Sequence, residues 1–256
     1  PAVGFSGDYY HRPAFIHGDC LEFQGCVMFI DPSGKGLDET AYAIVAHLNG
    51  NLFVLEVGAF REGYTEPVLE GLAKAAKRQK VKLILLEDQF GQGMLQSLLQ
   101  PFLRTHWPCT VEPVRSNMQK ERRIINALEP VLNQHRLIIN RSVIENDAKS
   151  HNDDPVETAL AYQLFHQLTH LTIDKNCLQH DDRLDALAGA VQYWNESLAI
   201  DEDRAIKERE SELWDLELAA YKGDIDGLLD AKVLGLPLEK LPKAQAGKGW
   251  MSVVGH

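Results

Sequence analysis

The sequence predicts an α/β domain with a mixed central sheet flanked by helices, followed by a charged helical tail. Three observations support this class. Two apolar runs on either side of Asn49-Gly50 form the strongest short-range signal for a β-hairpin. Further short apolar runs alternate with stretches of helical periodicity. After about Ser197 the composition changes to alternating charges, which is typical of a solvated helix.

Short apolar runs bounded by turn residues predict the strands. Cys26–Ile30 is too short for a helix and is followed by a turn at 32–36, so we expect a buried strand there. The hairpin adds strands at Ala41–Ala46 and Leu52–Val57. Later strands are expected at Leu83–Leu86 and at Cys109–Val114, and Leu137–Ile139 is a further short apolar piece.

Capping residues and apolar stripes predict the helices. Thr65 and Pro67 open the first helix, and Ser116 with Gln119 forms a capping box for a later one. The expected helices start at Thr65, at Met94 (to Leu103), at Ser116 (ending before Pro130), at Asp154 (to about Leu168) and at His180, with a separate solvated helix from about Ser197 to Lys222.

Acidic residues follow two of the strands. Asp31 ends the first strand and Glu87 ends the fourth, while Asp181, Asp182 and Asp185 fall within five residues at the start of a late helix. Asp182 and Asp185 are three apart and should be neighbours on a more exposed face of that helix. Because ionised carboxylates so close together repel, only a cation makes the arrangement favourable.

This order of elements and acids is the layout of the ribonuclease H-like fold. A central sheet brings the ends of its first and fourth strands side by side, and a late helix lays its acids across the gap. Carboxylate oxygens are preferred ligands of Mg²⁺ and Mn²⁺. Two such ions about 4 Å apart can activate a water and stabilise the leaving oxygen of a phosphodiester.

Four segments stand out in this order: Asp31–Ala43, Glu87 with the following Phe90-Gly91, the basic helix Lys120–Arg123, and His180–Ala186. Together they resemble the carboxyl-terminal nuclease domain of the large terminase subunit of tailed bacteriophages, closest to the short-tailed kind. The resemblance covers roughly residues 25 to 195. It implies a metal-dependent endonuclease that cuts concatemeric double-stranded DNA when packaging starts and ends.

The resemblance also implies roles for individual residues. Asp31 and Glu87 match the first two metal-binding acids, and Asp185 is favoured as the third, so these three are the expected catalytic residues. Asp182 is expected beside Asp185 as a further ligand, and Asp181 is the alternative for the third acid position. The ions are Mg²⁺ or Mn²⁺, two in number. Lys120 and Arg123 are the expected DNA contacts, and solvated helix faces are the alternative reading of these basic residues.

Domain organisation and partners follow from the same resemblance. Residues 1–24 are expected to be a linker from an absent ATPase domain, 25–196 the nuclease domain, and 197–256 a docking tail. The expected partners are double-stranded DNA, the portal protein, the small terminase subunit and the ATPase half of the same polypeptide. The expected location is the host cytoplasm, with transient docking on the viral procapsid, and no membrane contact.

Composition limits these expectations. The 256 residues carry a formal net charge of -11, which argues against a general nucleic-acid coat. The four cysteines do not have the spacing of a zinc site or of a disulfide framework. Ser33–Gly36 lacks the spacing of a loop that binds nucleotide phosphates, so no nucleotide cofactor is expected. Two alternatives stay open: a catalytically silent module that docks the motor on the portal, and a junction-resolving nuclease of the same fold.

Overall fold

The computed structural model describes residues 2–3, 9–10, 21–32, 39–87, 93–115, 118–151 and 153–221. The chain divides into two units, Pro1–Trp194 and Asn195–His256. The turn expected at 33–36 and the capping serine expected at 116 lie outside the described residues. Within the described part, no helix is both long enough and apolar enough to cross a membrane.

The first unit contains a six-stranded mixed sheet with the strand order β7-β6-β3-β4-β5-β8. Strands β3 and β4 and strands β4 and β5 pair antiparallel, while the other three pairings are parallel. The strands of this sheet are β3 (Gly25–Asp31), β4 (Thr40–Leu48), β5 (Asn51–Phe60), β6 (Leu83–Glu87), β7 (Thr110–Val114) and β8 (Leu137–Ile139). Two short strands, β1 (Ala2–Val3) and β2 (Tyr9–Tyr10), pair separately. The five strands expected from the sequence are present, and the short apolar piece at Leu137–Ile139 is a sixth strand, β8. The pair β1 and β2 was not predicted.

The β4–β5 hairpin turns at Asn49-Gly50, as the sequence predicts. Both residues have positive φ, 50° at Asn49 and 77° at Gly50. Asparagine and glycine tolerate this left-handed backbone conformation best, and a two-residue turn of this kind matches the twist of the strands that it joins. Register then runs from Leu48 opposite Asn51 to Thr40 opposite Phe60, with one irregularity between Ile44 and Val45.

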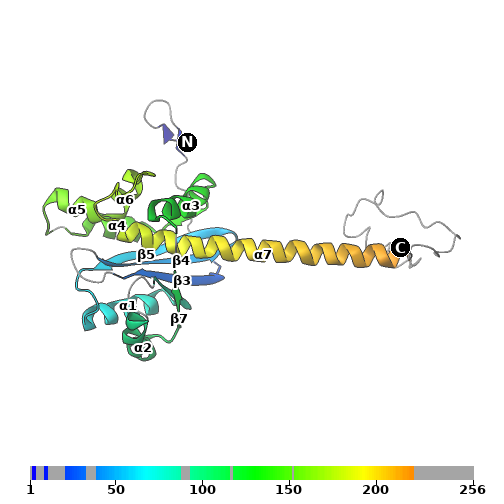
Figure 1. Cartoon of the computed structure of the whole chain (residues 1–256), viewed down its shortest axis with the longest axis horizontal. Helices are drawn as coiled ribbons and strands as arrows, with labels where there is room; N and C mark the ends of the chain where they lie inside the picture. The colour runs from blue at the N-terminus through cyan, green and yellow to red at the C-terminus, as the bar shows by residue number, and fades with distance from the viewer. Residues whose placement is uncertain are drawn as a thin grey trace, which may run out of the picture. The chain divides into compact units, whose positions relative to one another are not determined.

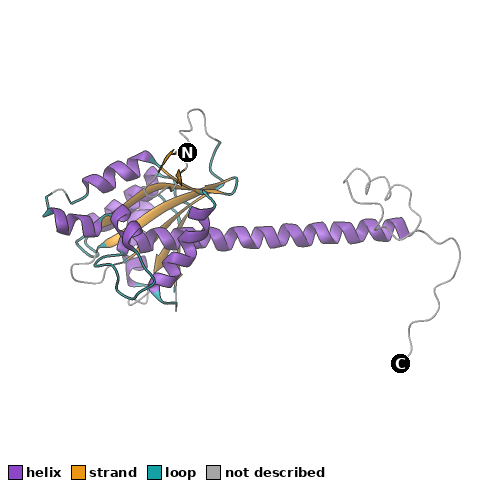
Figure 2. Ribbon diagram, turned by 90° about the horizontal axis from the view of Figure 1, so that it is seen from above, coloured by secondary structure: helices purple, strands orange, loops and turns teal. Residues whose placement is uncertain are grey.

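Helices cover both faces of the sheet (Figure 1). Helices α1 (Glu66–Arg78) and α2 (Met94–His106) lie on one face and enclose the main hydrophobic core with every second residue of β3 and β4. Helix α3 (Lys120–Asn133) and the first turns of α7 (Asp182–Tyr221) lie on the other face. Figure 2 shows the strands enclosed between these helical layers.

The region between β8 and α7 differs from the sequence prediction. Helix α4 (Arg141–Lys149) was not predicted, although Asn140 caps it by accepting a hydrogen bond from the Ser142 amide at 3.0 Å. The single helix expected from Asp154 to about Leu168 is wrong. It is two short helices, α5 (Val156–Tyr162) and α6 (Leu164–His170), separated at Gln163, whose ψ of 132° is extended.

The physical reason for this break is a cap that comes from another helix. The Asp147 carboxylate of α4 accepts hydrogen bonds from the amides of Leu164 at 2.8 Å and Phe165 at 3.1 Å. A carboxylate at these amides satisfies donors that a helix start leaves unpaired, so it favours a new helix there.

Three other helix ends were also wrong. Helix α3 begins at Lys120 with Gln119 as its N-cap, so Gln119 is not the third helical residue that a capping box from Ser116 requires. Pro130 lies inside α3 and not beyond its end. The charged segment after Ser197 does not start a separate helix, because α7 runs without interruption from Asp182 to Tyr221. No glycine or proline occurs between Ala190 and Tyr221, so nothing in that stretch of sequence interrupts a helix.

Candidate metal centre

Asp31 and Glu87 stand side by side at one edge of the sheet. They end the parallel strands β3 and β6, whose register pairs Phe29 with Leu85 and Ile30 with Leu86. Successive side chains of a strand point to opposite faces. The Ile30 and Leu86 side chains belong to the core under α1 and α2, so both carboxylates face the layer of α3 and α7.

Helix α7 brings a third acid to this point because it packs unusually close to β3. A Cβ added at Gly189 would lie only 2.4 Å from the Phe29 ring. Asp185 is one helical turn before Gly189, and Asp31 is two residues after Phe29; both spacings are about 6 Å along their elements. Ligand atoms of Asp31, Glu87 and Asp185 accordingly lie within 4.8 Å of one another, and all three residues are buried.

Two cations from the first turn of α3 pair with these acids. The Lys120 Nζ lies 3.2 Å from the Asp185 Oδ2 and 3.7 Å from the Asp31 Oδ2. The Arg123 guanidinium lies 2.7 Å from Glu87 and 2.7 Å from Asp185. The side chain of Lys120 is 33% exposed, while that of Arg123 is only 9% exposed. The two expected DNA contacts are therefore part of the acid cluster itself.

Burial and mutual repulsion shift the ionisation of this cluster. Burial raises the pKa of Asp31 well above its ordinary value, and the neighbouring charges of Asp185 and Glu87 raise it further, while Lys120 opposes the change. Burial likewise raises the pKa of Asp185, against the opposing effects of Lys120 and Arg123. Burial alone would lower the pKa of Lys120, but Asp185 and Asp31 outweigh it and raise that pKa.

The other two acids of this helix start lie beside the cluster. The Asp182 Oδ2 accepts a hydrogen bond from the Glu39 amide at 3.3 Å, and Asp181 pairs with Lys120 at 2.9 Å. The expectation that Asp182 and Asp185 share a more exposed face is wrong: Asp182 is 9% exposed and Asp185 is 0% exposed. Neighbouring elements cover this face of α7, which a helical periodicity cannot reveal.

A second charged cluster lies next to the first and was not predicted from the sequence. Arg183, between Asp182 and Asp185 on α7, is buried and pairs with Glu39 and Asp147. Glu39 lies in the segment Asp31–Ala43 and Arg183 in the segment His180–Ala186. The sequence analysis drew attention to both segments, but only because of their aspartates. A charged residue on the apolar side of a helix start was the available signal, because such residues are seldom buried without partners.

Comparisons with known proteins point to one kind of domain. Residues 30–137 match the family described as Terminase Bacteriophage T7, Ribonuclease H-like domain. The chain is 38% identical over 201 residues to the terminase large subunit of Enterobacteria phage T3, an alignment that covers 78% of this chain and 34% of that protein. The chain thus spans about a third of the length of this relative. The family match and the sheet order confirm the expected ribonuclease H-like fold.

Solved structures give weaker matches. The Mn-soaked, inhibitor-bound human cytomegalovirus terminase nuclease domain is 14% identical with a TM-score of 0.47, covering 66% of this chain and 82% of that chain. The nuclease domain of the large terminase subunit of bacterial virus Sf6 is 14% identical with a TM-score of 0.41, covering 67% of this chain and 87% of that chain.

Proposed function

Since the chain belongs to the ribonuclease H-like nuclease domains of terminase large subunits, we propose that it is a divalent-metal-dependent DNA endonuclease. It cuts concatemeric double-stranded DNA at the start and end of packaging by hydrolysing phosphodiester bonds. The observation that carries this proposal is the convergence of Asp31, Glu87 and Asp185, from three separate elements, on one buried point.

The donor set fits a hard divalent cation. Three carboxylates with ligand atoms within 4.8 Å of one another suit Mg²⁺ or Mn²⁺, which prefer oxygen ligands. Asp31, Glu87 and Asp185 would hold the ions, with Asp182 beside them. When bound, two such ions supply an activated water and charge stabilisation for the leaving oxygen of the phosphodiester.

The residues of the chain supply burial, orientation and opposite charge. The acids are held on the ends of paired strands and on a closely packed helix, which fixes their spacing. Lys120 lines a cavity of about 300 Å³ together with Lys175 and Asp181, next to the acid cluster. Lys120 and Arg123 are the proposed contacts to a DNA phosphate, because their charges lie beside the acids that would hold the ions.

The domain boundaries, the partners and the location are proposed from the same family membership. Residues 25–196 form the nuclease domain, 1–24 a linker to an ATPase half, and 197–256 a docking tail. Its partners are double-stranded DNA, the portal protein and the small terminase subunit, and it works in the host cytoplasm while docked on the procapsid.

A plasmid-nicking assay with and without Mn²⁺ tests the proposal. The purified chain should convert supercoiled plasmid to nicked and linear forms with Mn²⁺ and leave it intact with a chelator. A folded chain that binds no Mn²⁺ and never cuts would overturn the nuclease proposal and favour the catalytically silent docking module. Preferential cutting of four-way junctions over plain duplex would instead favour the junction-resolving nuclease.

A further inference from the structure

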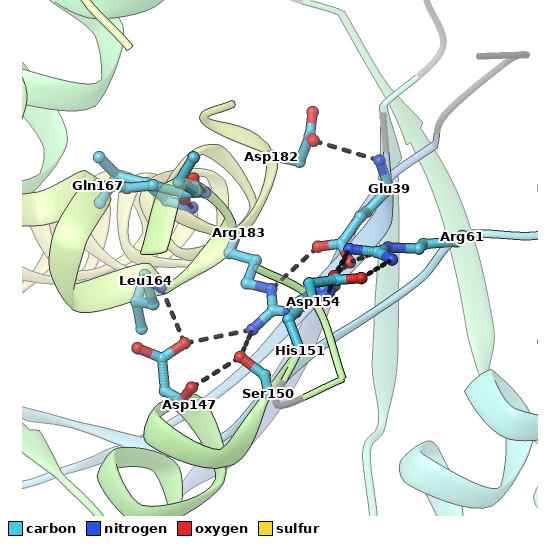
Figure 3. Close-up of polar contacts among 12 residues, drawn as sticks. Glu39, Arg61, Asp147, Ser150, His151, Asp154, Leu164, Gln167, Asp182 and Arg183 are labelled. Atoms are coloured by element: carbon cyan, nitrogen blue, oxygen red, sulfur yellow. Dashed lines mark hydrogen bonds and ion pairs between the residues drawn. The ribbon is translucent and has the colours of Figure 1, made fainter. Parts of the chain in front are cut away.

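The guanidinium of Arg183 joins the start of α7 to two other parts of the fold (Figure 3). Its Nε lies 3.1 Å from the Glu39 Oε2, just before β4. Its Nη1 lies 3.2 Å from Asp147 and 2.9 Å from the Ser150 Oγ, at the end of α4, and its Nη2 lies 2.9 Å from the His151 Nε2. Arg183 is 5% exposed, so its guanidinium is largely buried, although it also lines a cavity of about 550 Å³ together with Glu39 and His151.

The residues on either side of Arg183 are also tied to the rest of the domain. The Glu39 amide donates to the Asp182 carboxylate at 3.3 Å, as Figure 3 shows. The Leu184 amide donates to the Gln167 Oε1 at 3.0 Å. Three consecutive residues of α7, immediately before Asp185, are therefore each bonded to a segment distant in sequence.

A buried ion pair with several hydrogen bonds has one favourable geometry. Both partners are buried, so breaking the pair leaves a charge in the interior without its partner. Arg183 and Asp185 lie in the same helical turn of α7, so a shift of Arg183 would also displace the Asp185 carboxylate. Within the described part of the chain, Arg183 makes no direct contact with Asp31 or Glu87. It is connected to the acid cluster through α7 and through Glu39, which precedes β4, the strand whose Ala41 pairs with Asp31.

We propose that Arg183 and Glu39 are positioning residues that hold the Asp185 carboxylate in the acid cluster and thereby set its affinity for divalent cations. This inference rests on the proposed function, because it concerns the same metal centre. Groups that orient metal ligands without touching the ion change metal affinity by about 10–100-fold when they are altered. The network around Arg183 has the burial, the fork geometry and the position that such a role requires.

Metal affinity and fold stability, measured on the same variants, test this role. The full 256-residue chain is titrated with Mn²⁺ by calorimetry, and its Tm is measured without metal. Arg183→Lys keeps the charge but loses the planar fork, and Glu39→Gln keeps the shape but loses the negative charge. Each should weaken Mn²⁺ binding by about tenfold or more, in a chain that still unfolds cooperatively.

Arg78→Lys is the control for an ion pair away from the metal centre. Arg78 makes a similar two-nitrogen contact with Glu56 on β5, but its side chain is 54% exposed, and within the described chain its contacts do not involve α7. Because an exposed ion pair contributes little to stability, the control should change Tm only slightly and should change the Kd for Mn²⁺ by less than about twofold. A purely structural role of Arg183 would lower Tm and leave the Kd for Mn²⁺ as unchanged as in this control.

The outcomes separate the two proposals. If the parent chain binds Mn²⁺ and folded Arg183→Lys and Glu39→Gln bind it equally well, the positioning role is wrong and the nuclease proposal is untouched. If the parent chain itself binds no Mn²⁺, the metal centre is wrong and the positioning role is refuted with it. Should Arg183→Lys fail to fold, the milder Glu39→Gln decides the question alone.

Discussion

The guanidinium of Arg123 lies 2.7 Å from the carboxylate of Asp185, in the middle of a buried acid cluster. The same guanidinium lies 2.7 Å from Glu87, so one side chain of α3 bridges acids of β6 and α7. Such pairing is what makes ionised groups tolerable in an interior. A change of charge at this point should therefore alter both ion binding and the free energy of unfolding.

Asp31→Asn should abolish Mn²⁺-dependent plasmid cutting while leaving the fold intact. The amide keeps the size of the side chain but is a poor ligand for a hard cation, so the loss should exceed the roughly 10–100-fold that is typical of groups outside the ligand set. Nicking assays at saturating Mn²⁺ measure this. Glu129→Gln, an exposed change on α3, serves as the control, and full activity of Asp31→Asn would refute the assigned site.

The stability of Asp31→Asn should depend on pH. Burial raises the pKa of Asp31, so between its ordinary and its raised pKa the native state binds more protons than the unfolded chain, and stability falls as pH rises. The variant has no carboxylate to ionise at this position, so it should be more stable than the parent near neutral pH. Each kcal/mol gained in the free energy of unfolding should raise Tm by about 2–4 °C.

This gain should shrink as pH falls toward about 3.9, the ordinary pKa of aspartate. Metal-free urea unfolding of both chains from about pH 4.5 to 8 measures the difference. A gain that is independent of pH, or one that grows toward acid, would contradict the charge-repulsion explanation.

The chain should neither hydrolyse ATP nor need it for cutting. Ser33–Gly36 does not have the Gly-x-x-x-x-Gly-Lys-Ser/Thr spacing that binds nucleotide phosphates. Phosphate release from ATP by the purified chain should equal the buffer blank, and nicking rates should be equal with and without ATP. Turnover that co-purifies with the chain would reveal a nucleotide site that the sequence does not indicate.

DNA binding should be weak, independent of base sequence and steeply dependent on salt. The net charge of -11 opposes binding, and Lys120 is the more exposed of the two cations that pair with the acids, at 33% against 9% for Arg123. Lys120→Gln should reduce the slope of log K against log salt by about 0.9, the value for one phosphate contact. Anisotropy of a labelled duplex, measured with Ca²⁺ in place of Mn²⁺, gives the slope.

Lys74→Gln is the matched control for this measurement. Lys74 is exposed on α1 and pairs with Glu70 at 2.9 Å, on the other face of the sheet from α3. Lys77 and Lys80, which follow Lys74, precede the start of β6, whereas Glu87 lies at the other end of that strand. This group of lysines is therefore at the opposite end of β6 from the acid cluster. An equal loss of slope in both variants would mean that Lys120 has no special place in DNA binding.

Removal of residues 200–256 should leave plasmid cutting equal or better and should abolish packaging in a reconstituted system. The tail carries a narrow apolar stripe that includes Ile206, Leu213 and Leu216, which suits contact with another protein such as the portal. The deletion also removes negative charge that opposes DNA binding. If the truncated chain folds but no longer cuts, the tail belongs to the catalytic unit and the boundary near residue 196 is wrong.

Local patterns in the sequence were enough to predict the main strands of the large sheet, the hairpin and the positions of Asp31 and Glu87 at strand ends. These are local properties. A run of apolar residues ending in an acid places that acid at a strand end, and Asn49-Gly50 favours one turn whatever surrounds it. The fixed alternation of side chains along paired strands then puts the two carboxylates on the same face.

Packing between distant segments determines which acids of the last motif point inward, and which cations neutralise them. The local sequence does not distinguish Asp181, Asp182 and Asp185 from one another. In the folded chain, the close contact of Gly189 with Phe29 places Asp185 over the strand ends. The break at Gln163 and the network around Arg183 likewise depend on Asp147 and Glu39, which are distant in sequence from their partners. Such contacts form only when packing brings separate segments together, so no local pattern encodes them.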